Sequence, residues 1–463
     1  MATAEGTSPT KLKRPDLEDM RREGIVKALT KALITADHFA IDESYSLYRY
    51  QDECYRLGGE HYIGRALIRL CNDWKVSRLW STRLEHEILS QIIRTVPSLW
   101  TERPSDRINV RNGILSLTSP IKLLPHSPKF LSNIQIAVSY NPKATCPAWE
   151  RQIRETLPED CQNLVWQILA WLILPEAKIQ QAILFLGGGA NGKSRLLQAI
   201  RAFLGESNVT SFSLHQLEKD RFSTALLVGM LANICSDLPS EHLASTAMFK
   251  AILSEDTIQA QHKFRPSFSL TPHCKLLFSA NSFPQSSDTS YGFLRRIVPV
   301  PFDKQFIETA IPSFIIDKRL AKPSEVSGAL NKALEVLPGL RQGTSFEQSP
   351  SMKATWSQFY DSSYSVDRET EKLALWLDRY TLIDPESKVS KADLYDTWKA
   401  WAQRTGTGTE SPQWFGRRLR ELRPSLQPVQ ITAQHIWAWQ GISLRSQNGL
   451  PTRRPQSQKP PIY

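Results

Sequence analysis

One eight-residue segment constrains this chain more than any other. Residues 187–194 read GGGANGKS, which fits the pattern G-x-x-x-x-G-K-[ST]; an apolar run precedes them at 182–186 and an amphipathic run follows at 195–204. That order predicts a strand, a glycine-rich turn and a helix, in which backbone N–H groups and the helix N-terminus face one phosphate group. The segment therefore predicts an α/β fold that binds a nucleoside triphosphate.

The residue types of this loop indicate which of them would contact the phosphates and which would bind a metal ion. Lys193 is expected to reach the β- and γ-phosphates, and the Ser194 hydroxyl is expected to be a Mg²⁺ ligand, so ATP and Mg²⁺ are the expected cofactors. A chance glycine-rich turn with an exposed lysine is the alternative, but both flanks have the required pattern. The expected cofactor-binding residues are Gly187, Gly188, Gly189, Ala190, Asn191, Gly192, Lys193 and Ser194.

Composition favours a multidomain protein of the cytoplasm. The 463 residues suffice for two to four domains, and 57 basic against 46 acidic residues give a net charge of +11. Such a charge favours polyanionic partners, although it also serves simple solubility. No signal peptide is evident, and the longest apolar run, 164–174, contains Gln167 and is read as a buried helix. The scattered cysteines form no C-x-x-C pair, which argues against structural zinc or disulfides.

Periodicity divides the chain into segments. Apolar runs at 182–186, 229–234, 275–280 and 297–302 alternate with helical patterns, which predicts a largely parallel α/β sheet with an AAA+-like P-loop core. Helical and strand-like patterns are mixed before this core, and Asn112-Gly113 indicates a hairpin. The expected organisation is a disordered tail at 1–22, an α+β accessory module at 23–141, a helical collar at 142–178, the ATPase domain at 179–345, a linker at 346–369, a winged-helix-like domain at 370–445 and a disordered tail at 446–463.

Two polar residues follow predicted strands of the core. Asp237 comes after the apolar run at 229–234 and is expected to hold the Mg²⁺-bound water, although a turn also suits it. Asn281 follows the run at 275–280 and could position the attacking water. Because Ser282 and Pro284 follow it, a turn-forming role for Asn281 stays open.

Two basic features could reach beyond the nucleotide. Arg295 and Arg296 precede the last core strand, where an arginine could stabilise charge on the γ-phosphate of an adjacent subunit; a surface arginine pair is the commoner case. Residues 257–270 predict a hairpin with His262, Lys263, Phe264 and Arg265 at its tip. Such a tip can contact phosphates and stack on bases, or it can be a solvated loop.

Taken in this order, the motifs resemble superfamily-three helicases of the phage/plasmid and poxvirus primase–helicase family. The similarity extends over roughly 35–445, and only the phosphate loop is specific by itself; order and spacing carry the rest. The segments concerned are RNGILSLTS with PHSP (111–128), FLGGGANGKS, LANICSDLP, MFKAILSEDTIQAQHKF, KLLFSAN, YGFLRRIVPVPF and SGALNKAL (327–334).

The resemblance implies a ring-forming ATP-driven DNA helicase, expected to be hexameric, that binds nucleotide between subunits. It would translocate on single-stranded DNA and separate forked DNA in phage, plasmid or mobile-element replication, alongside a separate primase or other replication proteins. The catalytic set that it implies is Lys193, Asp237 as the metal-site acid, Asn281 as the sensor and Arg296, with Arg295 as second choice, as the arginine finger. The DNA-gripping set that it implies is His262, Lys263 and Arg265.

The sequence departs from this family in three places. Ser236 precedes a single acid, Asp237, where many relatives have two, so the general base stays open, with Glu241 nearby. Ser254-Glu255-Asp256 stands where relatives often have a glycine before the hairpin. Residues 1–141 are too short for a catalytic primase beside the accessory module, so the chain is expected to be the helicase half alone.

Two other functions stay open. An ATP-regulated replication initiator or target-DNA-binding protein would use the same motifs without unwinding DNA. A P-loop regulator that does not bind nucleic acid is the second alternative, and the basic hairpin together with the net charge of +11 argues against it.

Overall fold

The computed structural model describes two compact units, 1–356 and 357–463. The residues described are 21–100, 106–174, 179–239, 241–284, 286, 288, 290–306, 313–363, 368–405, 411–431 and 436–445. The predicted tails therefore lie outside the described residues, apart from residues 21 and 22. Each unit is described by itself.

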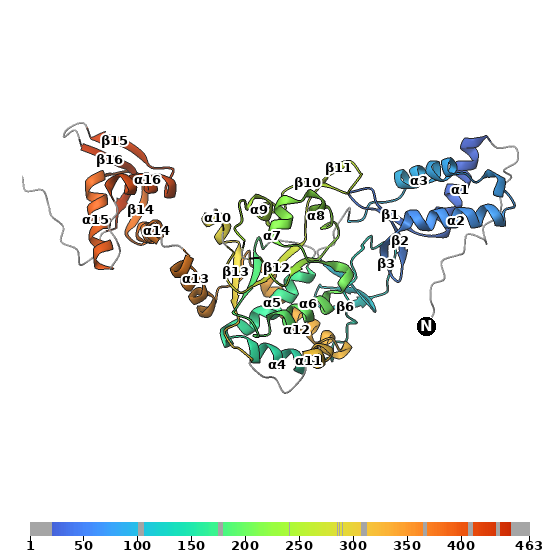
Figure 1. Ribbon diagram of the computed structural model, residues 1–463, viewed down its shortest axis with the longest axis horizontal. Coiled ribbons are helices and arrows are strands. Elements are labelled where there is room, and N and C mark those ends of the chain that lie inside the picture. The colour runs from blue at the N-terminus through green and yellow to red at the C-terminus, as the bar shows by residue number, and fades with distance from the viewer. Residues whose placement is uncertain are drawn as a thin grey trace, which may run out of the picture. The chain divides into compact units, whose positions relative to one another are not determined.

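A five-stranded parallel sheet forms the centre of the first unit (Figure 1), with the strand order β13-β7-β12-β9-β8. Its strands are nearly all buried, because helices cover a parallel sheet on both faces. The predicted parallel α/β core is confirmed, although the short β8 has no sequence signal of its own. The strands are β7 (Ala182–Leu186), β8 (Val209–Thr210), β9 (Ala232–Cys235), β12 (Lys275–Ala280) and β13 (Ile297–Pro301).

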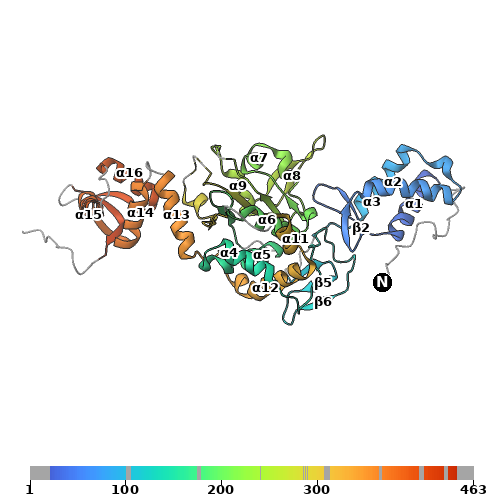
Figure 2. The same cartoon turned by 60° about the horizontal axis from the view of Figure 1, so that its bottom comes forward.

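Helices pack around this sheet, and α4, α5 and α12 lie together on one side of it (Figure 2). The apolar run at 164–174 falls in α5, most of whose residues are buried, as predicted. No helix among the described residues is long and apolar enough to span a membrane. These helices are α4 (Pro147–Thr156), α5 (Gln162–Ile173), α6 (Lys193–Leu204), α7 (Leu214–Lys219), α8 (Arg221–Ala225), α9 (Ala247–Leu253), α10 (Tyr291–Leu294), α11 (Ser313–Leu320) and α12 (Pro323–Gln342), with short 3₁₀ turns at Glu159–Cys161 and Glu206–Asn208.

An α+β module precedes the core. Its helices lie against a small antiparallel sheet, and a second antiparallel sheet contains the hairpin predicted at Asn112-Gly113. The elements are α1 (Arg22–Ala36), β1 (Phe39–Ile41), β2 (Leu47–Gln51), β3 (Cys54–Leu57), α2 (Gly59–Asp73), a 3₁₀ turn (Ser77–Leu79), α3 (Thr82–Thr95), β4 (Arg107–Val110), β5 (Gly113–Ser116) and β6 (Lys122–Leu124). All six cysteines of the chain lie in the described residues, where they are buried and free.

The segment predicted as a linker, 346–369, includes a helix. It contains the helix α13 (Pro350–Ser363), which begins at a proline, and the Asp160 carboxylate accepts a hydrogen bond from the Ser351 backbone N–H at 2.8 Å. A carboxylate at a helix N-terminus satisfies a free N–H group and favours helix formation there. Asp160 is 191 residues away from Ser351 in sequence, so no local pattern predicts this contact.

The second unit has its own aromatic core, built around Trp376, Trp398, Phe415 and Trp439. Its elements follow the order helix, strand, helix, helix, strand, strand, and the antiparallel sheet has the order β14-β16-β15. The elements are α14 (Arg368–Tyr380), β14 (Thr381–Ser390), α15 (Lys391–Arg404), α16 (Pro412–Leu422), β15 (Gln427–Ile431) and β16 (Ile436–Leu444).

Candidate functional site

The glycine-rich loop curls tightly between β7 and α6. Gly187 has φ +158°, and a Cβ there would lie 2.2 Å from Asn191 Nδ2 and 2.4 Å from the Phe302 carbonyl oxygen. Gly192 has φ +88°, and a Cβ there would meet Thr156 Cγ2 at 2.6 Å. The backbone path therefore requires glycine at both positions, as a phosphate-cradling loop does.

Lys193, the first residue of α6, is held inside this loop. It is 5% exposed, and its ammonium donates to the Gly187 carbonyl oxygen and to Asn191 Oδ1, the latter at 3.0 Å. The Asn191 amide in turn donates to the Phe302 carbonyl oxygen at 3.0 Å. Burial lowers the pKa of Lys193, and the nearby Asp237 carboxylate acts in the opposite direction. A cation is thus fixed at the inner side of the loop, facing an acid.

Three adjacent parallel strands end at this edge of the sheet. The loop follows β7, Asn281 follows β12, and Asp237 lies two residues beyond β9. Cross-links fix these strand ends, because the Leu238 N–H donates to the Ser279 carbonyl oxygen at 2.8 Å and the Gly187 N–H donates to the Ala280 carbonyl oxygen at 3.3 Å. The structure therefore brings the loop, Asp237 and Asn281 to one edge, where ligands of open α/β sheets bind.

The oxygen groups at this edge suit a divalent cation. The Ser194 hydroxyl lies at the start of α6, and both Ser194 and Asp237 are exposed. Mg²⁺ takes oxygen ligands and uses only one or two protein groups beside phosphates and waters, so this set fits it. Glu241 is also exposed, in the segment between β9 and α9, where its backbone carbonyl lies 3.1 Å from His215 Nε2.

The two arginines before β13 have different surroundings. The Arg296 guanidinium donates to the Gly292 carbonyl oxygen and, at 3.1 Å, to the Ser254 hydroxyl at the end of α9. Burial lowers the pKa of Arg296, the Arg295 charge lowers it further, and Asp256 opposes both. Arg295 is exposed. Of the pair, Arg295 presents its side chain to solvent, while Arg296 holds the chain's own helix α9.

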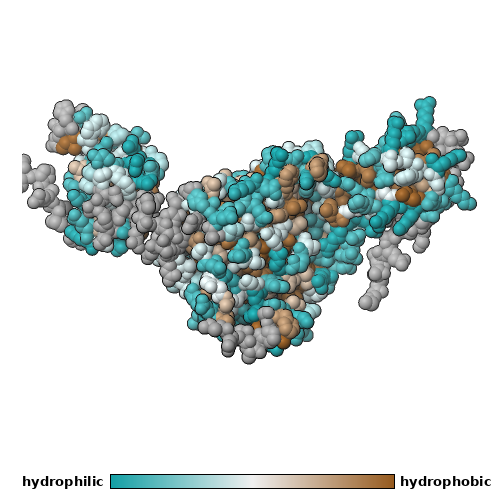
Figure 3. All heavy atoms as spheres, in the orientation of Figure 1, coloured by the Kyte–Doolittle hydropathy of each residue, from teal (hydrophilic) through white to brown (hydrophobic). Residues whose placement is uncertain are grey.

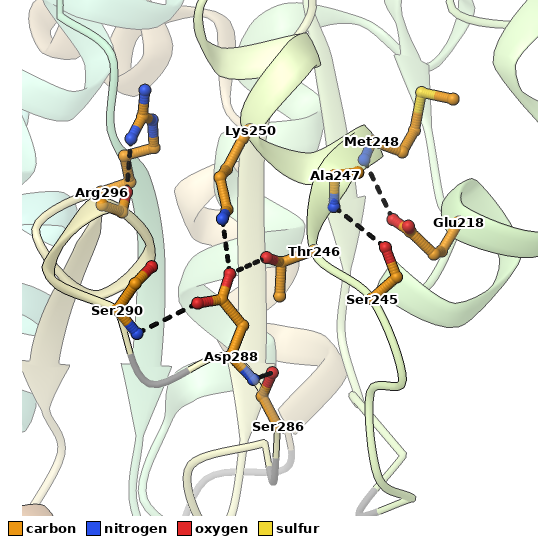
Figure 4. Close-up of polar contacts among 11 residues, drawn as sticks. Glu218, Ser245, Thr246, Ala247, Met248, Lys250, Ser286, Asp288, Ser290 and Arg296 are labelled. Atoms are coloured by element: carbon orange, nitrogen blue, oxygen red, sulfur yellow. Dashed lines mark hydrogen bonds and ion pairs between the residues drawn. The ribbon is translucent and has the colours of Figure 1, made fainter. Parts of the chain in front are cut away.

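A second contact links the same segment to α9 (Figure 4). Asp288 accepts hydrogen bonds from the Thr246 hydroxyl, from the Lys250 ammonium at 2.5 Å and from the Ser290 backbone N–H at 3.0 Å. Burial alone would raise the pKa of Asp288, but the hydrogen bonds from Lys250, Ser290 and Thr246 hold it well below its ordinary value. Asp288 and Arg296 therefore bond to α9 and its flanking residues near both ends of the helix.

The predicted hairpin is present and directly follows α9. Strands β10 (Ile258–Gln261) and β11 (Ser267–Leu270) pair in antiparallel register. Phe264 at the tip is 93% exposed, and Lys263 Nζ lies 5.2 Å from its ring centroid. The His262 ring stacks on Phe268 with a centroid distance of 5.5 Å. The tip therefore offers one ring and one ammonium group to a partner, as single-stranded nucleic-acid grips do.

Arg265 differs from the other two basic residues of the tip. Its guanidinium donates to Ser46 Oγ at 3.4 Å and lies 3.8 Å from Glu60 Oε1, both in the N-terminal module. These partners are far from Arg265 in sequence, so no local pattern distinguishes Arg265 from Lys263.

Two features of the site go beyond the residues expected from the sequence. The DNA-gripping set that the resemblance implies leaves out Phe264, although an aromatic residue between two basic ones at a hairpin tip is an available signal. Asp288 lies in a serine-rich stretch that reads as an ordinary turn, and its partners Thr246 and Lys250 are about 40 residues away.

Comparisons with known proteins agree with this arrangement. Residues 74–158 match the family model described as D5 N terminal like, and residues 185–296 match the family of unknown function DUF5906. The apo structure of the NrS-1 C terminal region shares the fold, with 11% identity, a TM-score of 0.51, and coverage of 90% of this chain and 98% of that one. Its A form apo structure aligns with 11% identity, a TM-score of 0.50, and coverage of 89% and 98%. The chain thus carries a D5-N-terminal-like segment and a DUF5906 segment on the fold of the NrS-1 C terminal region.

Proposed function

We propose that this protein is an ATP-dependent DNA helicase of the superfamily-three type, acting in phage, plasmid or mobile-element replication. The observation that carries the proposal is the convergence of the Lys193 loop, Asp237 and Asn281 at the ends of three adjacent parallel strands. The strand order β13-β7-β12-β9-β8 supports the expected AAA+-like P-loop core. The D5 N terminal like match and the NrS-1 fold support the same family.

The residues at the sheet edge would divide the chemistry as follows. The loop N–H groups and Lys193 would bind the β- and γ-phosphates, and Lys193 would exchange its bonds with the loop for phosphate oxygens. Ser194 and Asp237 would hold Mg²⁺, which neutralises charge developing on the phosphates. Asn281 would orient the attacking water.

The site would be completed by a neighbouring subunit. An exposed arginine can reach the γ-phosphate across an interface; Arg295 is exposed, and no hydrogen bond or ion pair of its side chain is found among the described residues. Arg296, the first choice from the sequence, bonds Ser254 and Gly292, so we assign it to holding α9. Head-to-tail contacts of this kind repeat from subunit to subunit and can close into a ring, for which a hexamer is the proposed state.

DNA would be gripped by the hairpin and bound by the second unit. Lys263 and His262 would contact the phosphate backbone, and Phe264 would stack on a base. The element order of the second unit is compatible with the winged-helix-like domain expected there, and Arg417 and Arg420 are exposed on α16. We propose that α16 contacts duplex DNA ahead of the fork.

An ATP-regulated initiator that does not unwind DNA is the alternative, and the winged-helix-like element order of the second unit favours it. Both functions predict ATP binding and DNA binding. Fork unwinding by the purified protein separates them, because only the helicase converts hydrolysis into strand separation.

The proposal is tested by the ATP hydrolysis rate with and without single-stranded DNA. We expect DNA to stimulate hydrolysis, Lys193→Ala to abolish it, and Lys263→Ala to retain the basal rate while losing the stimulation. A Lys193→Ala variant that hydrolyses ATP at the wild-type rate would contradict the ATPase assignment. A wild-type hydrolysis rate that is the same with and without single-stranded DNA would contradict the coupling between ATP hydrolysis and DNA binding.

A further inference from the structure

A row of basic side chains follows helix α2 in the N-terminal module. His61, Arg65 and Arg69 recur every four residues, which places them on one side of the helix, and all three are exposed. With Gly58, Tyr62 and Ala66 they line a hollow of about 390 Å³. We call this hollow the α2 groove. Figure 3 shows mainly hydrophilic side chains over much of this module.

The neighbouring sheet adds to this charge. The Arg49 guanidinium lies 3.8 Å from the centroid of the Tyr62 ring. Arg56 is the cross-strand partner of Arg49, so both side chains lie on the same face of the sheet. The groove is therefore lined by basic side chains of α2, and the Tyr62 ring connects it to the arginines of the neighbouring sheet.

Two of the acids near the groove are engaged with other arginines. Asp37 forms an ion pair with Arg49, and Glu60 lies 3.8 Å from Arg265. Among the described residues, no ion pair involves Arg56, Arg65 or Arg69. On the same module, by contrast, Arg22 and Arg83 both pair with Glu87. Arg65 and Arg69 in the groove therefore keep their charge without an ion-pair partner among the described residues, whereas Arg49 beside it is paired with Asp37.

The groove also begins beside the hairpin. Arg265 of the hairpin tip contacts Ser46 and Glu60, and Glu60 immediately precedes His61 at the start of α2. A strand held at the tip by Lys263 would need to extend only a short distance to reach the groove.

We propose that the α2 groove binds the phosphodiester backbone of the single-stranded nucleic acid held by the hairpin. Guanidinium groups donate paired hydrogen bonds to phosphate oxygens, and a row spaced by one helical turn can contact successive phosphates. Tyr62 offers part of a ring against which a sugar or base can lie. The inference rests on the proposed function in one respect, that the hairpin holds a nucleic-acid strand.

The test is the affinity of the full chain for a fluorescent dT oligonucleotide, measured by anisotropy across a range of salt concentrations. In Arg65→Ala/Arg69→Ala, two lost phosphate contacts should reduce the salt slope by about 1.4 and weaken binding about 20-fold at ~0.1 M salt. The basal ATPase rate and the melting temperature should not change. Arg65→Lys/Arg69→Lys should retain most of the affinity.

Lys27→Ala/Lys31→Ala is the matched control, because it removes the same charge from exposed positions of α1 in the same module. An equal loss of affinity in this control would show that the effect comes from net charge alone. That result would overturn the proposal that the α2 groove binds the strand. Unchanged binding in Arg65→Ala/Arg69→Ala, with binding lost in Lys263→Ala, would overturn the groove and leave the proposed function intact. A wild-type chain that binds no oligonucleotide would overturn both.

Competition identifies the occupant. Unlabelled dT or rU of equal length should displace the probe from the wild type, and their relative strength shows whether DNA or RNA is preferred. Polyglutamate of equal charge should compete poorly. If it competes as well as dT, the groove is a site for an acidic polypeptide and the assignment to nucleic acid is wrong.

Discussion

At the scale of single residues, Gly187 and Gly188 form a natural pair of probes. A Cβ at Gly187 would clash with Asn191 and with the Phe302 carbonyl oxygen, whereas a Cβ at Gly188 would meet only Gln305 Nε2, at an ordinary 3.6 Å. Gly187→Ala should therefore destabilise the fold by about 1–3 kcal/mol and weaken ATP binding, because the loop must shift. Gly188→Ala should change stability by less than ~0.5 kcal/mol. Thermal unfolding and nucleotide titration check both, and equal effects would contradict the loop geometry.

The exposed arginine permits a sharper test of shared active sites. Arg295→Ala should lower the ATP hydrolysis rate on the order of 10³-fold, because charge on the γ-phosphate loses its partner. In a mixed ring, some interfaces would combine the intact loop of an Arg295→Ala subunit with the intact Arg295 of a Lys193→Ala subunit. Mixing the two inactive variants, Lys193→Ala and Arg295→Ala, should therefore restore part of the activity.

Absence of any recovery on mixing would indicate that each site is built within one subunit. The Arg296→Ala variant serves for comparison. It removes the bond to Ser254, so it should lower the melting temperature as well as the rate. An Arg296→Ala protein with wild-type stability would contradict its assignment to holding α9.

At the scale of secondary-structure elements, Asp288 joins the arginine segment to α9, the helix that leads into the hairpin. Asp288→Asn should lower the stimulation of hydrolysis by single-stranded DNA several-fold, because it weakens the contacts between the arginine segment and α9. Basal hydrolysis should fall less than in Arg295→Ala, because Arg295 itself is kept. Ser245→Ala is the control, since the Ser245 hydroxyl accepts a hydrogen bond from the Ala247 N–H at the start of α9, and no hydrogen bond or ion pair joins Ser245 to the described part of the 288–296 segment. A similar loss in this control would mean that any weakening of α9 suffices.

The same carboxylate gives a pH dependence with a definite sign. The pKa of Asp288 is lowered on folding, so its contribution to stability is complete above its ordinary value of 3.8 and is lost as the pH falls below it. The difference in unfolding free energy between the wild type and Asp288→Asn should be about 1.5–3 kcal/mol at neutral pH and should shrink below pH ~4. Chemical denaturation across this pH range measures it. A constant difference would show that ionised Asp288 does not stabilise the fold.

At the scale of the whole molecule, the two units have separate cores and should unfold separately. Trp398 is 0% exposed in the core of the second unit, so Trp398→Ala should cost that unit about 3–5 kcal/mol. Basal ATP hydrolysis and the melting of the first unit should not change. Trp437→Ala is the control, because Trp437 is 55% exposed. Calorimetry reports both transitions, and loss of ATPase activity in Trp398→Ala would contradict their independence.

Helices, strands and turns that have a local sequence pattern could be predicted. Contacts between side chains far apart in the sequence could not. The glycine loop, the buried strands 182–186 and 275–280 and the hairpin at 257–270 have their own patterns, and the structure places them as expected. The partners of Arg265, Arg296 and Asp288 come from segments far apart in sequence, and no periodicity encodes them. For the same reason the sequence could not divide the roles of Arg295 and Arg296.

The central claim is that ATP hydrolysis at the loop drives strand separation. It is tested most directly by unwinding of a forked DNA duplex, measured as release of a labelled strand with ATP, without ATP and with the Lys193→Ala protein. We expect release only by the wild-type protein with ATP, and its loss in Lys263→Ala despite basal hydrolysis. A wild-type protein that hydrolyses ATP and binds the fork but releases no strand would contradict the claim.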